Sequence, residues 1–108
     1  MFDRLKSQRV TLGGFTNQQE VSQLTVFLGL YNAEQYLESL ETQLESQTST
    51  LPIIVVDNQS TDNTWQLVQS WLTKFSGRIL LVRNATNLGG TGTLLSNLDL
   101  IPSAWVAT

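Results

Sequence analysis

Segments with the composition of strands alternate with segments of helical pattern along most of the chain, and no other feature restricts its fold as strongly. The apolar, strand-like segments span residues 24–30, 53–57, 78–83 and 103–108. The segments between them have apolar side chains at helical spacing and span residues 33–45, 62–75 and 93–100. Alternation of this kind with short connections predicts a parallel sheet covered by helices on both faces. We therefore expect an α/β fold with three layers, α/β/α, and a mainly parallel sheet.

The strand that says most about function is the run Ile53-Ile54-Val55-Val56-Asp57. Its four β-branched residues are typical of a strand that is buried on both faces. They lead into Asp57 and Asn58, which precede a group of small polar residues. Ligands of open α/β sheets bind at the carboxyl ends of the strands, so both polar side chains are expected at a binding edge.

Helix boundaries are predicted from the polar residues that flank each helical pattern. Asn32 is expected to cap the helix that begins at Ala33, and Ser60 or Thr61 to cap the helix after the 53–57 strand. The third helix, over residues 93–100, is predicted from three leucines at helical spacing, which are Leu94, Leu95 and Leu98.

The length of 108 residues indicates a single domain. Residues 1–23 are expected to form an N-terminal arm or an extra strand, with a turn over residues 12–17. Residues 24–108 are expected to form the main unit.

Composition excludes several classes of function. The chain has no Cys and no His, so acid–base chemistry or metal binding would have to use carboxylates. The six basic residues lie at positions 4–9 and 74–83 and do not form the basic stripe of a nucleic-acid-binding protein. The sequence shows no signal-peptide pattern and no apolar run of transmembrane length, so the expected form is a soluble cytoplasmic chain.

Three loops are expected to meet at the carboxyl edge of the sheet, at residues 29–32, 57–60 and 84–92. The carboxylate of Asp57 could accept a hydrogen bond from a ribose hydroxyl or from the ring N–H of a pyrimidine. The carboxamide of Asn58 can both donate and accept, which suits the edge of a base. The alternative is that both side chains bind the backbone of their own loop.

The stretch Asn87-Leu88-Gly89-Gly90-Thr91-Gly92 follows a strand and precedes a helix. Backbone N–H groups in that position suit a diphosphate, and glycines allow its close approach. The dinucleotide fingerprint is not met, because Leu95 stands where a third small residue is required. The alternative is a flexible glycine-rich turn.

Four motifs, in this order, resemble the N-terminal part of the family 2 glycosyltransferases, which are inverting enzymes with the GT-A fold. The motifs are Leu30-Tyr31-Asn32, the Glu- and Leu-rich helix from Ala33, the run from Val56 to Thr64, and Asn87-Leu88-Gly89-Gly90. The third motif fits the pattern Val-Asp-Asp/Asn-x-Ser-Thr-Asp-x-Thr of the family closely. The resemblance covers about residues 24–108 and implies a Rossmann-like sheet, as part of the GT-A fold.

The resemblance implies that the matching positions bind the nucleotide of a sugar donor. The residues expected to line the nucleotide pocket are Gly29, Leu30, Tyr31 and Asn32. Asp57 and Asn58 are expected to hold the base and ribose. The residues expected to lie along the nucleotide or diphosphate are Asn87, Gly89, Gly90 and Asn97. The donor would be a UDP- or dTDP-linked sugar. The combination of Asn58 with Asn-Leu-Gly-Gly is similar to the branch that uses dTDP-rhamnose or UDP-galactofuranose.

The sequence departs from the family pattern in two places. Asn58 replaces the second acid of the usual Asp-Asp, and the metal-binding Asp-x-Asp, which follows the fourth strand in the family, does not occur.

The complete enzymes would use a divalent cation, Mg²⁺ or Mn²⁺. The resemblance therefore implies that residues 24–108 are the nucleotide-binding half of a glycosyltransferase domain, truncated before Asp-x-Asp. It would contain no catalytic or metal-binding residue and be inactive alone. Its fourth strand, near Trp105, would be an exposed edge that favours self-association.

Two other hypotheses remain open from the sequence. A non-catalytic nucleotide-binding module would use the same strand-end residues without a transfer reaction. The second hypothesis is an unrelated doubly wound domain of the flavodoxin or response-regulator type. A response regulator requires a cluster of acids at strand ends, where only Asp57 is found.

Overall fold

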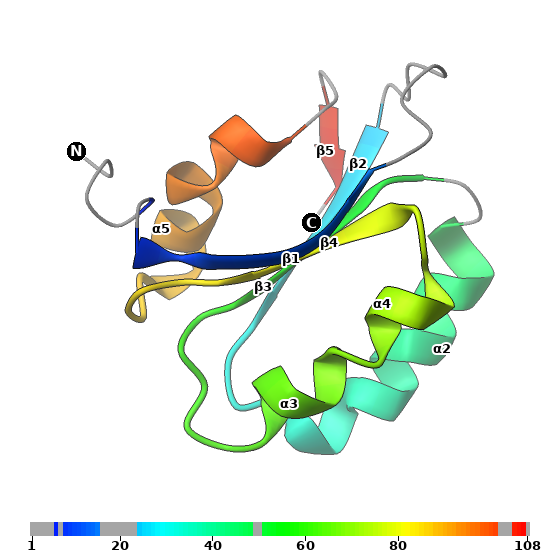
Figure 1. The fold of residues 1–108 in the computed structure, drawn as a ribbon, viewed down its shortest axis with the longest axis horizontal. Helices are drawn as coiled ribbons and strands as arrows, with labels where there is room; N and C mark the ends of the chain where they lie inside the picture. The colour runs from blue at the N-terminus through cyan, green and yellow to red at the C-terminus, as the bar shows by residue number, and fades with distance from the viewer. Residues whose placement is uncertain (1–5, 7, 16–23, 49–50, 102–104, 108) are drawn as a thin grey trace.

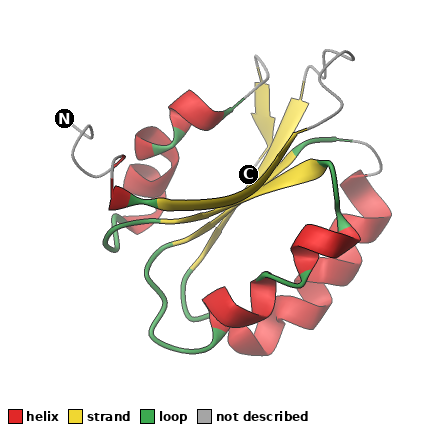
Figure 2. Ribbon diagram, in the orientation of Figure 1, coloured by secondary structure: helices red, strands yellow, loops and turns green. Residues whose placement is uncertain are grey.

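The computed structural model describes residues 6, 8–15, 24–48, 51–101 and 105–107, which form one five-stranded sheet with helices on both faces (Figures 1 and 2). The strands are β1 (Val10–Phe15), β2 (Leu24–Leu30), β3 (Ile53–Asp57), β4 (Arg78–Arg83) and β5 (Trp105–Ala107). The helices are η1 (Glu34–Tyr36), α2 (Leu37–Thr48), α3 (Thr64–Val68), α4 (Trp71–Lys74), α5 (Gly89–Ser96) and η2 (Leu98–Leu100).

The strand order is β1-β4-β3-β2-β5, and every pairing except that of β1 with β4 is parallel. The prediction of a mainly parallel sheet is therefore confirmed. The last strand, β5, pairs with β2, so Trp105 to Ala107 lie at an edge of the sheet as predicted. The side chains of β5 lie outside the described residues, and self-association through this edge stays a prediction.

The helices form two layers, one on each face of the sheet (Figure 1). α2, α3 and α4 cover one face, and α5 with η2 covers the other. Strand β3 is fully buried, and its side chains alternate between the two hydrophobic cores. Ile53 and Val55 pack with helix residues such as Trp71 and Phe75, whereas Ile54 and Val56 belong to the opposite core. Each such buried side chain contributes about 1.5–3 kcal/mol, and together they confirm the three-layer arrangement.

The N-terminal segment differs from the expected turn over residues 12–17. Leu12 to Phe15 belong to β1, which pairs antiparallel with β4. Gly13 has φ +83°, and a Cβ placed there would lie 2.6 Å from the carbonyl oxygen of Ile79. The glycine signal thus marks a close backbone approach inside a strand rather than a turn. Residues 16 and 17 lie outside the described part of the chain.

The predicted helix caps are wrong. Asn32 has φ +48° and lies before the N-cap, Ala33, whose side chain makes no capping hydrogen bond. Neither Ser60 nor Thr61 caps α3, since the N-cap position is Asn63. The reason is that Asn32 and Ser60 bind each other's loops instead, as described below.

The helix expected over residues 62–75 is divided into α3 and α4. At the division, the amide of Leu72 donates to the carbonyl of Gln69 at 3.2 Å, an i to i−3 bond that tightens the turn. The apolar stripe continues across it, because Val68, Trp71 and Phe75 are all buried.

The third helix, α5, begins at Gly89 and so includes the glycine-rich stretch. Two of the three leucines whose spacing predicts this helix, Leu95 and Leu98, are 48% and 49% exposed. Thr93 and Asn97 are buried instead, and hydrogen bonds to Asn84 compensate their polar groups.

The described helices are short: the longest of them, α2, has 12 residues. Within the described ranges, none has the length and apolar character that crossing a bilayer requires.

Candidate functional site at the carboxyl edge of the sheet

The loops that follow β2, β3 and β4 meet at one edge of the sheet. Leu30, Asp57 and Arg83 lie side by side in register at the ends of these strands. Hydrogen bonds continue the ladder by one residue, from Asn58 N to Leu30 O at 2.8 Å and from Asn84 N to Asp57 O at 2.9 Å. The predicted convergence of three polar loops is therefore present in the structure.

Asp57 is a fully buried carboxylate with one oxygen in use and one without a partner. Its Oδ2 accepts from Arg83 Nε at 3.1 Å and from the amide of Ser60 at 3.2 Å. Its Oδ1 is the one buried side-chain nitrogen or oxygen, within the part of the chain that the structure describes, without a hydrogen-bond partner. An unpaired buried acceptor costs about 1–3 kcal/mol, and more when it is charged. Such an atom calls for an explanation, and a bound ligand would supply its partner.

Arg83 holds the carboxylate of Asp57 in place. Its Nη2 donates to Ser60 O at 3.0 Å, so the guanidinium spans the side chain and the loop that follows it. The guanidinium carbon lies 5.9 Å from the centre of the Trp65 ring, over whose face it is placed. Sequence reasoning missed Arg83 as a site residue, although its position at the end of a strand beside Asp57 is a usable signal.

Asn58 links the β3 loop to the β4 loop. Its Oδ1 accepts from Asn84 Nδ2 and from the amide of Leu88, both at 2.9 Å. Its Nδ2 donates to Asn87 Oδ1 at 2.7 Å. Because a backbone N–H can only donate, the Leu88 contact fixes which end of the carboxamide is the oxygen. One N–H of Nδ2 is therefore committed, and the second is left for another acceptor.

The glycine-rich stretch is open to solvent at the start of α5. Asn87 Oδ1 accepts from the amide of Gly89 at 2.9 Å and so shapes the turn into the helix. Gly89 and Gly90 are exposed, and a Cβ added to either would meet no atom within 4 Å. These three predicted residues thus lie together beside Asn58.

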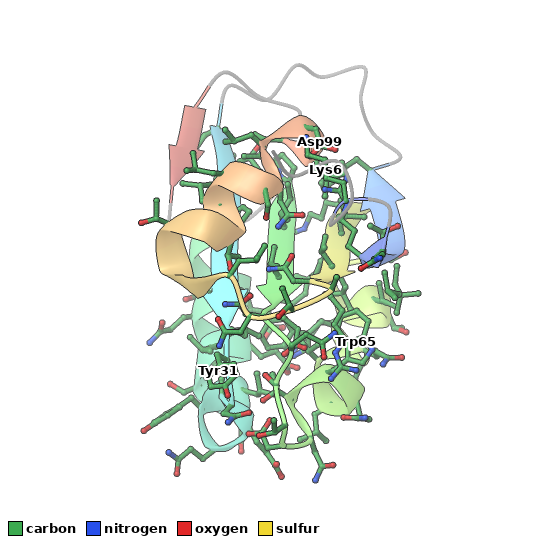
Figure 3. The ribbon with its side chains drawn as sticks, turned by 90° about the vertical axis from the view of Figure 1, so that its left-hand side faces the viewer. Lys6, Tyr31, Trp65 and Asp99 are labelled. Carbon is green, nitrogen blue, oxygen red and sulfur yellow. The ribbon has the colours of Figure 1, made fainter. Side chains whose placement is uncertain are left out.

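The four predicted residues after β2 have different surroundings. Gly29 is exposed, Leu30 is buried in the core and Tyr31 is half-exposed at the lower end of the sheet in Figure 3. Asn32 Oδ1 accepts from the amides of Thr61 and Asp62, at 2.8 and 3.3 Å.

Asn32 also fixes its own loop through the backbone. Its amide donates to Ser60 Oγ at 2.9 Å, and Gln59 Nε2 donates to Asn84 O at 2.6 Å on the other side of the β3 loop. Gln59 adopts φ +61°, an unfavourable value for a residue with a side chain. The β3 loop is therefore tied to both of its neighbours.

Asn97 lies under this site rather than in it. It is fully buried, and its Nδ2 donates to Asn84 Oδ1 at 3.0 Å and to Thr93 O at 2.8 Å. Asn97 therefore supports Asn84, which in turn binds Asn58. Asn84 was not among the predicted site residues, although it directly follows a strand.

A shallow depression of about 570 Å³ lies beside this edge, lined by Asn32, Glu34, Gln35, Asp62 and Leu67. The hydroxyl of Thr64 donates to Asp62 and lowers the pKa of its carboxyl. Two carboxylates on its wall make the depression unsuited to a diphosphate.

Within the described ranges, no three Asp, Glu, His or Cys side chains are grouped as a metal ion would require. Asp57 is engaged by Arg83, so the residues present at this edge do not fit a divalent cation.

Comparison with known structures supports the fold class. The N-terminal 349-residue part of S. aureus TarS has a TM-score of 0.64 and 28% sequence identity over 79% of this chain and 26% of the TarS chain. The architecture is thus that of the GT-A glycosyltransferases.

Sequence comparison supports the same class. EpsE of Bacillus subtilis (strain 168), a protein assigned to the glycosyltransferases, is 35% identical over 65 residues, 59% of this chain and 23% of EpsE. Abequosyltransferase RfbV of Salmonella typhimurium is 32% identical over 73 residues, 65% of this chain and 22% of RfbV.

Residues 25–108 match the profile of Glycosyl transferase family 2, so the chain belongs to that family. It spans roughly a quarter of the length of the relatives that it matches.

Proposed function

We propose that this chain binds the nucleotide part of a nucleotide-diphospho-sugar, as the donor-binding part of an inverting glycosyltransferase. The main support is the unpaired Oδ1 of Asp57, at the carboxyl end of the central strand of the sheet. That edge is where open α/β sheets bind their ligands. Membership of a glycosyltransferase family makes a donor nucleotide the natural partner for this acceptor.

The available groups match uracil or thymine better than cytosine. Uracil and thymine have a ring N–H beside carbonyl oxygens, so the ring N–H would donate to Asp57 Oδ1. The second N–H of Asn58 Nδ2 would donate to a base carbonyl or to ribose. Cytosine has a bare ring nitrogen and an amino group in the corresponding positions, which reverses the pattern. We therefore propose a UDP- or dTDP-linked donor.

The diphosphate would lie at the start of α5. Gly89 and Gly90 have no side chain to keep a ligand away from the backbone, and the space around them is open. The free N–H groups of a helix N-terminus and its positive dipole end favour an anion there. Gly29 and Tyr31, at the end of β2, would border the pocket on the other side. Asn32 and Asn97 would hold the surrounding loops in place.

In the transfer reaction, an acceptor hydroxyl would attack the anomeric carbon with a carboxylate as general base. We propose that this chain supplies donor recognition and that it transfers no sugar when it is isolated. The Asn58 and Asn87-Leu88-Gly89-Gly90 motifs favour a donor such as dTDP-rhamnose or UDP-galactofuranose. Sugar transfer by the isolated chain, with donor and divalent metal present, would show the assignment of the catalytic groups to be wrong.

The nucleotide site is tested by NMR titration of the ¹⁵N-labelled chain with UDP and with dTDP. We expect the largest shift changes at Asn58, Leu88, Gly89 and Gly90, saturating with one site. Changes confined to the acidic depression near Glu34, or none up to millimolar nucleotide, would refute the proposal.

A further inference from the structure

Arg9, from outside the region that matches the family profile, binds the end of α5. It lies just before β1, and its side chain is 11% exposed. Its Nη1 donates to Asn97 Oδ1 at 3.1 Å and to Ser96 O at 3.2 Å. Its Nη2 forms an ion pair with Asp99 Oδ2 at 2.6 Å. A cation that binds the last carbonyls of a helix stabilises that end.

Hydrogen bonds continue from Arg9 to the candidate site through a chain of carboxamides. Asn97 Nδ2 donates to Asn84 Oδ1 at 3.0 Å, and Asn84 Nδ2 donates to Asn58 Oδ1 at 2.9 Å. Asn58 Nδ2 donates in turn to Asn87 Oδ1 at 2.7 Å. Because arginine can only donate, every carboxamide accepts on its Arg9 side and donates on its site side.

The middle of the carboxamide chain is buried, and the chain is ordered from both ends. Asn84 is 2% exposed and Asn97 is 0% exposed. At the site end, the backbone amides of Leu88 and Gly89 donate to Asn58 Oδ1 and Asn87 Oδ1, both at 2.9 Å. Hydrogen bonds in a buried polar network strengthen one another cooperatively, so loss of one member affects the rest.

The two ends of this network lie at the two ends of α5, because Arg9 binds Ser96 and Asn97 whereas Asn87 lies just before Gly89. Figure 3 shows Lys6 and Asp99 together at the top, whereas Tyr31 lies at the carboxyl edge below. Lys6 and Asp99 are 3.9 Å apart, so the basic N-terminal segment meets the residues after α5 at two points. Helix α5 runs between these ends, and its first residues are Gly89 and Gly90.

We propose that Arg9 is a positioning residue for the nucleotide site. Its hydrogen bond to Asn97 Oδ1 and that of the Leu88 amide to Asn58 Oδ1 set the order of the carboxamide chain from its two ends, so loss of Arg9 weakens the order that holds the free N–H of Asn58 in its direction. The effect on nucleotide binding rests on the proposed function. The effect on the carboxamides is a property of the ligand-free chain and is tested separately.

The first test compares NMR spectra of the ligand-free chain and its variants. Arg9→Met keeps the aliphatic stem but removes every donor, and it is expected to shift the side-chain N–H₂ signals of Asn84 and Asn58 and the amide of Leu88. The control Lys74→Met removes ion pairs of 2.8 and 3.1 Å to Glu41 and Glu45 on the opposite helical layer. It should leave these signals in place. Arg9→Gln retains one NH₂ group as a donor, gives smaller shifts, and serves as the test if Arg9→Met does not fold.

The second test measures UDP binding by calorimetry. Arg9→Met is expected to weaken it about three- to tenfold, as for coupled members of one network, and Lys74→Met by less than about twofold. Asp99→Asn removes the ion pair but keeps the Arg9–Asn97 contact, so its UDP affinity should also stay within about twofold of that of wild type.

The possible outcomes are distinguishable. Shifts in Arg9→Met that stop at Asn97 would overturn the positioning role, even if UDP binds normally. A wild-type chain that binds neither UDP nor dTDP would refute the proposed function, while the ligand-free spectra would still decide the role of Arg9.

Discussion

Asp57→Asn tests the proposed base recognition with the smallest change of shape. The asparagine can keep an oxygen toward Arg83 and Ser60, where Oδ2 accepts at 3.1 and 3.2 Å. Its NH₂ group then occupies the place of the unpaired Oδ1. The substitution therefore replaces an acceptor with a donor at the point where a uracil or thymine N–H would bind.

The expected loss follows from the value of a hydrogen bond to a charged group, about 1.5–3 kcal/mol, which corresponds to roughly 10- to 150-fold weaker UDP binding. The affinity for CDP should fall little or rise, because the bare ring nitrogen of cytosine can accept a hydrogen bond from the new NH₂ group. The free energy of unfolding should fall by about 1–2 kcal/mol, between the values for exposed and buried ion pairs. The pair is intermediate because Asp57 is fully buried and the Arg83 side chain is 26% exposed.

The assay is calorimetric titration of wild type and variant with UDP and CDP, after circular dichroism has shown both to be folded. The matched control is Asp62→Asn, an acid from the same loop whose Oδ1 serves the amide and hydroxyl of Thr64, at 2.9 and 2.6 Å. It should lower stability but keep UDP affinity within about twofold. A folded Asp57→Asn chain that binds UDP as wild type does, or keeps the full preference for UDP over CDP, would refute the assignment.

Three further predictions concern glycines and pH. Gly13→Ala should lower the free energy of unfolding by at least about 2 kcal/mol, because its Cβ would lie 2.6 Å from the backbone oxygen of Ile79; a thermal melt near that of wild type would contradict this. Gly90→Ala has open surroundings and should stabilise α5 by about 0.5–1 kcal/mol, yet weaken UDP more than uridine; an unchanged ratio of the two affinities would argue against a diphosphate at this position. The hydrogen bond from Arg9 lowers the pKa of Asp99 from its ordinary value of 3.8, so its stabilisation is present above that pH and disappears as the pH falls through the lower folded pKa. The drop in melting temperature from pH 6 to pH 3 should therefore be smaller in Asp99→Asn than in wild type. The two drops should differ by the equivalent of less than about 1 kcal/mol. Equal drops in the two chains would exclude the effect.

The sequence predicts the layers and the mainly parallel sheet because burial dominates both. The run Ile53 to Val56 has a composition that only a doubly covered strand satisfies, and the structure buries all of it. The short connections then restrict the pairing to parallel neighbours. The family resemblance implies that the fourth strand lies at an edge of the sheet, and β5 is at an edge, beside β2.

Local predictions failed where long-range hydrogen bonds outweigh local preference. Asn32 is a good N-cap by type, but its carboxamide binds the amides of Thr61 and Asp62 from another loop. Leu95 fits an apolar stripe by spacing, yet the sheet-facing side of α5 is occupied by polar residues that bind Asn84. Asn32 and its two partners are about thirty residues apart in the sequence, and hydrogen bonds between loops at such a separation leave no periodic signal.

The site residues were predictable to the extent that they lie at strand ends. Asp57 and Asn58 are predicted from their position alone, and their neighbours Arg83 and Asn84 have the same position on the next strand; that they bind a ligand stays a prediction. The link to Arg9 was beyond prediction, because it depends on how the N-terminal segment packs against the end of α5.

The most direct test of the account is a crystal structure of the chain with UDP bound. The account predicts that Asp57 Oδ1 accepts from the uracil ring N–H at about 2.7–3.0 Å, with the diphosphate at Gly89 and Gly90. A complex in which UDP binds elsewhere, or in which Asp57 Oδ1 remains without a partner, would contradict it.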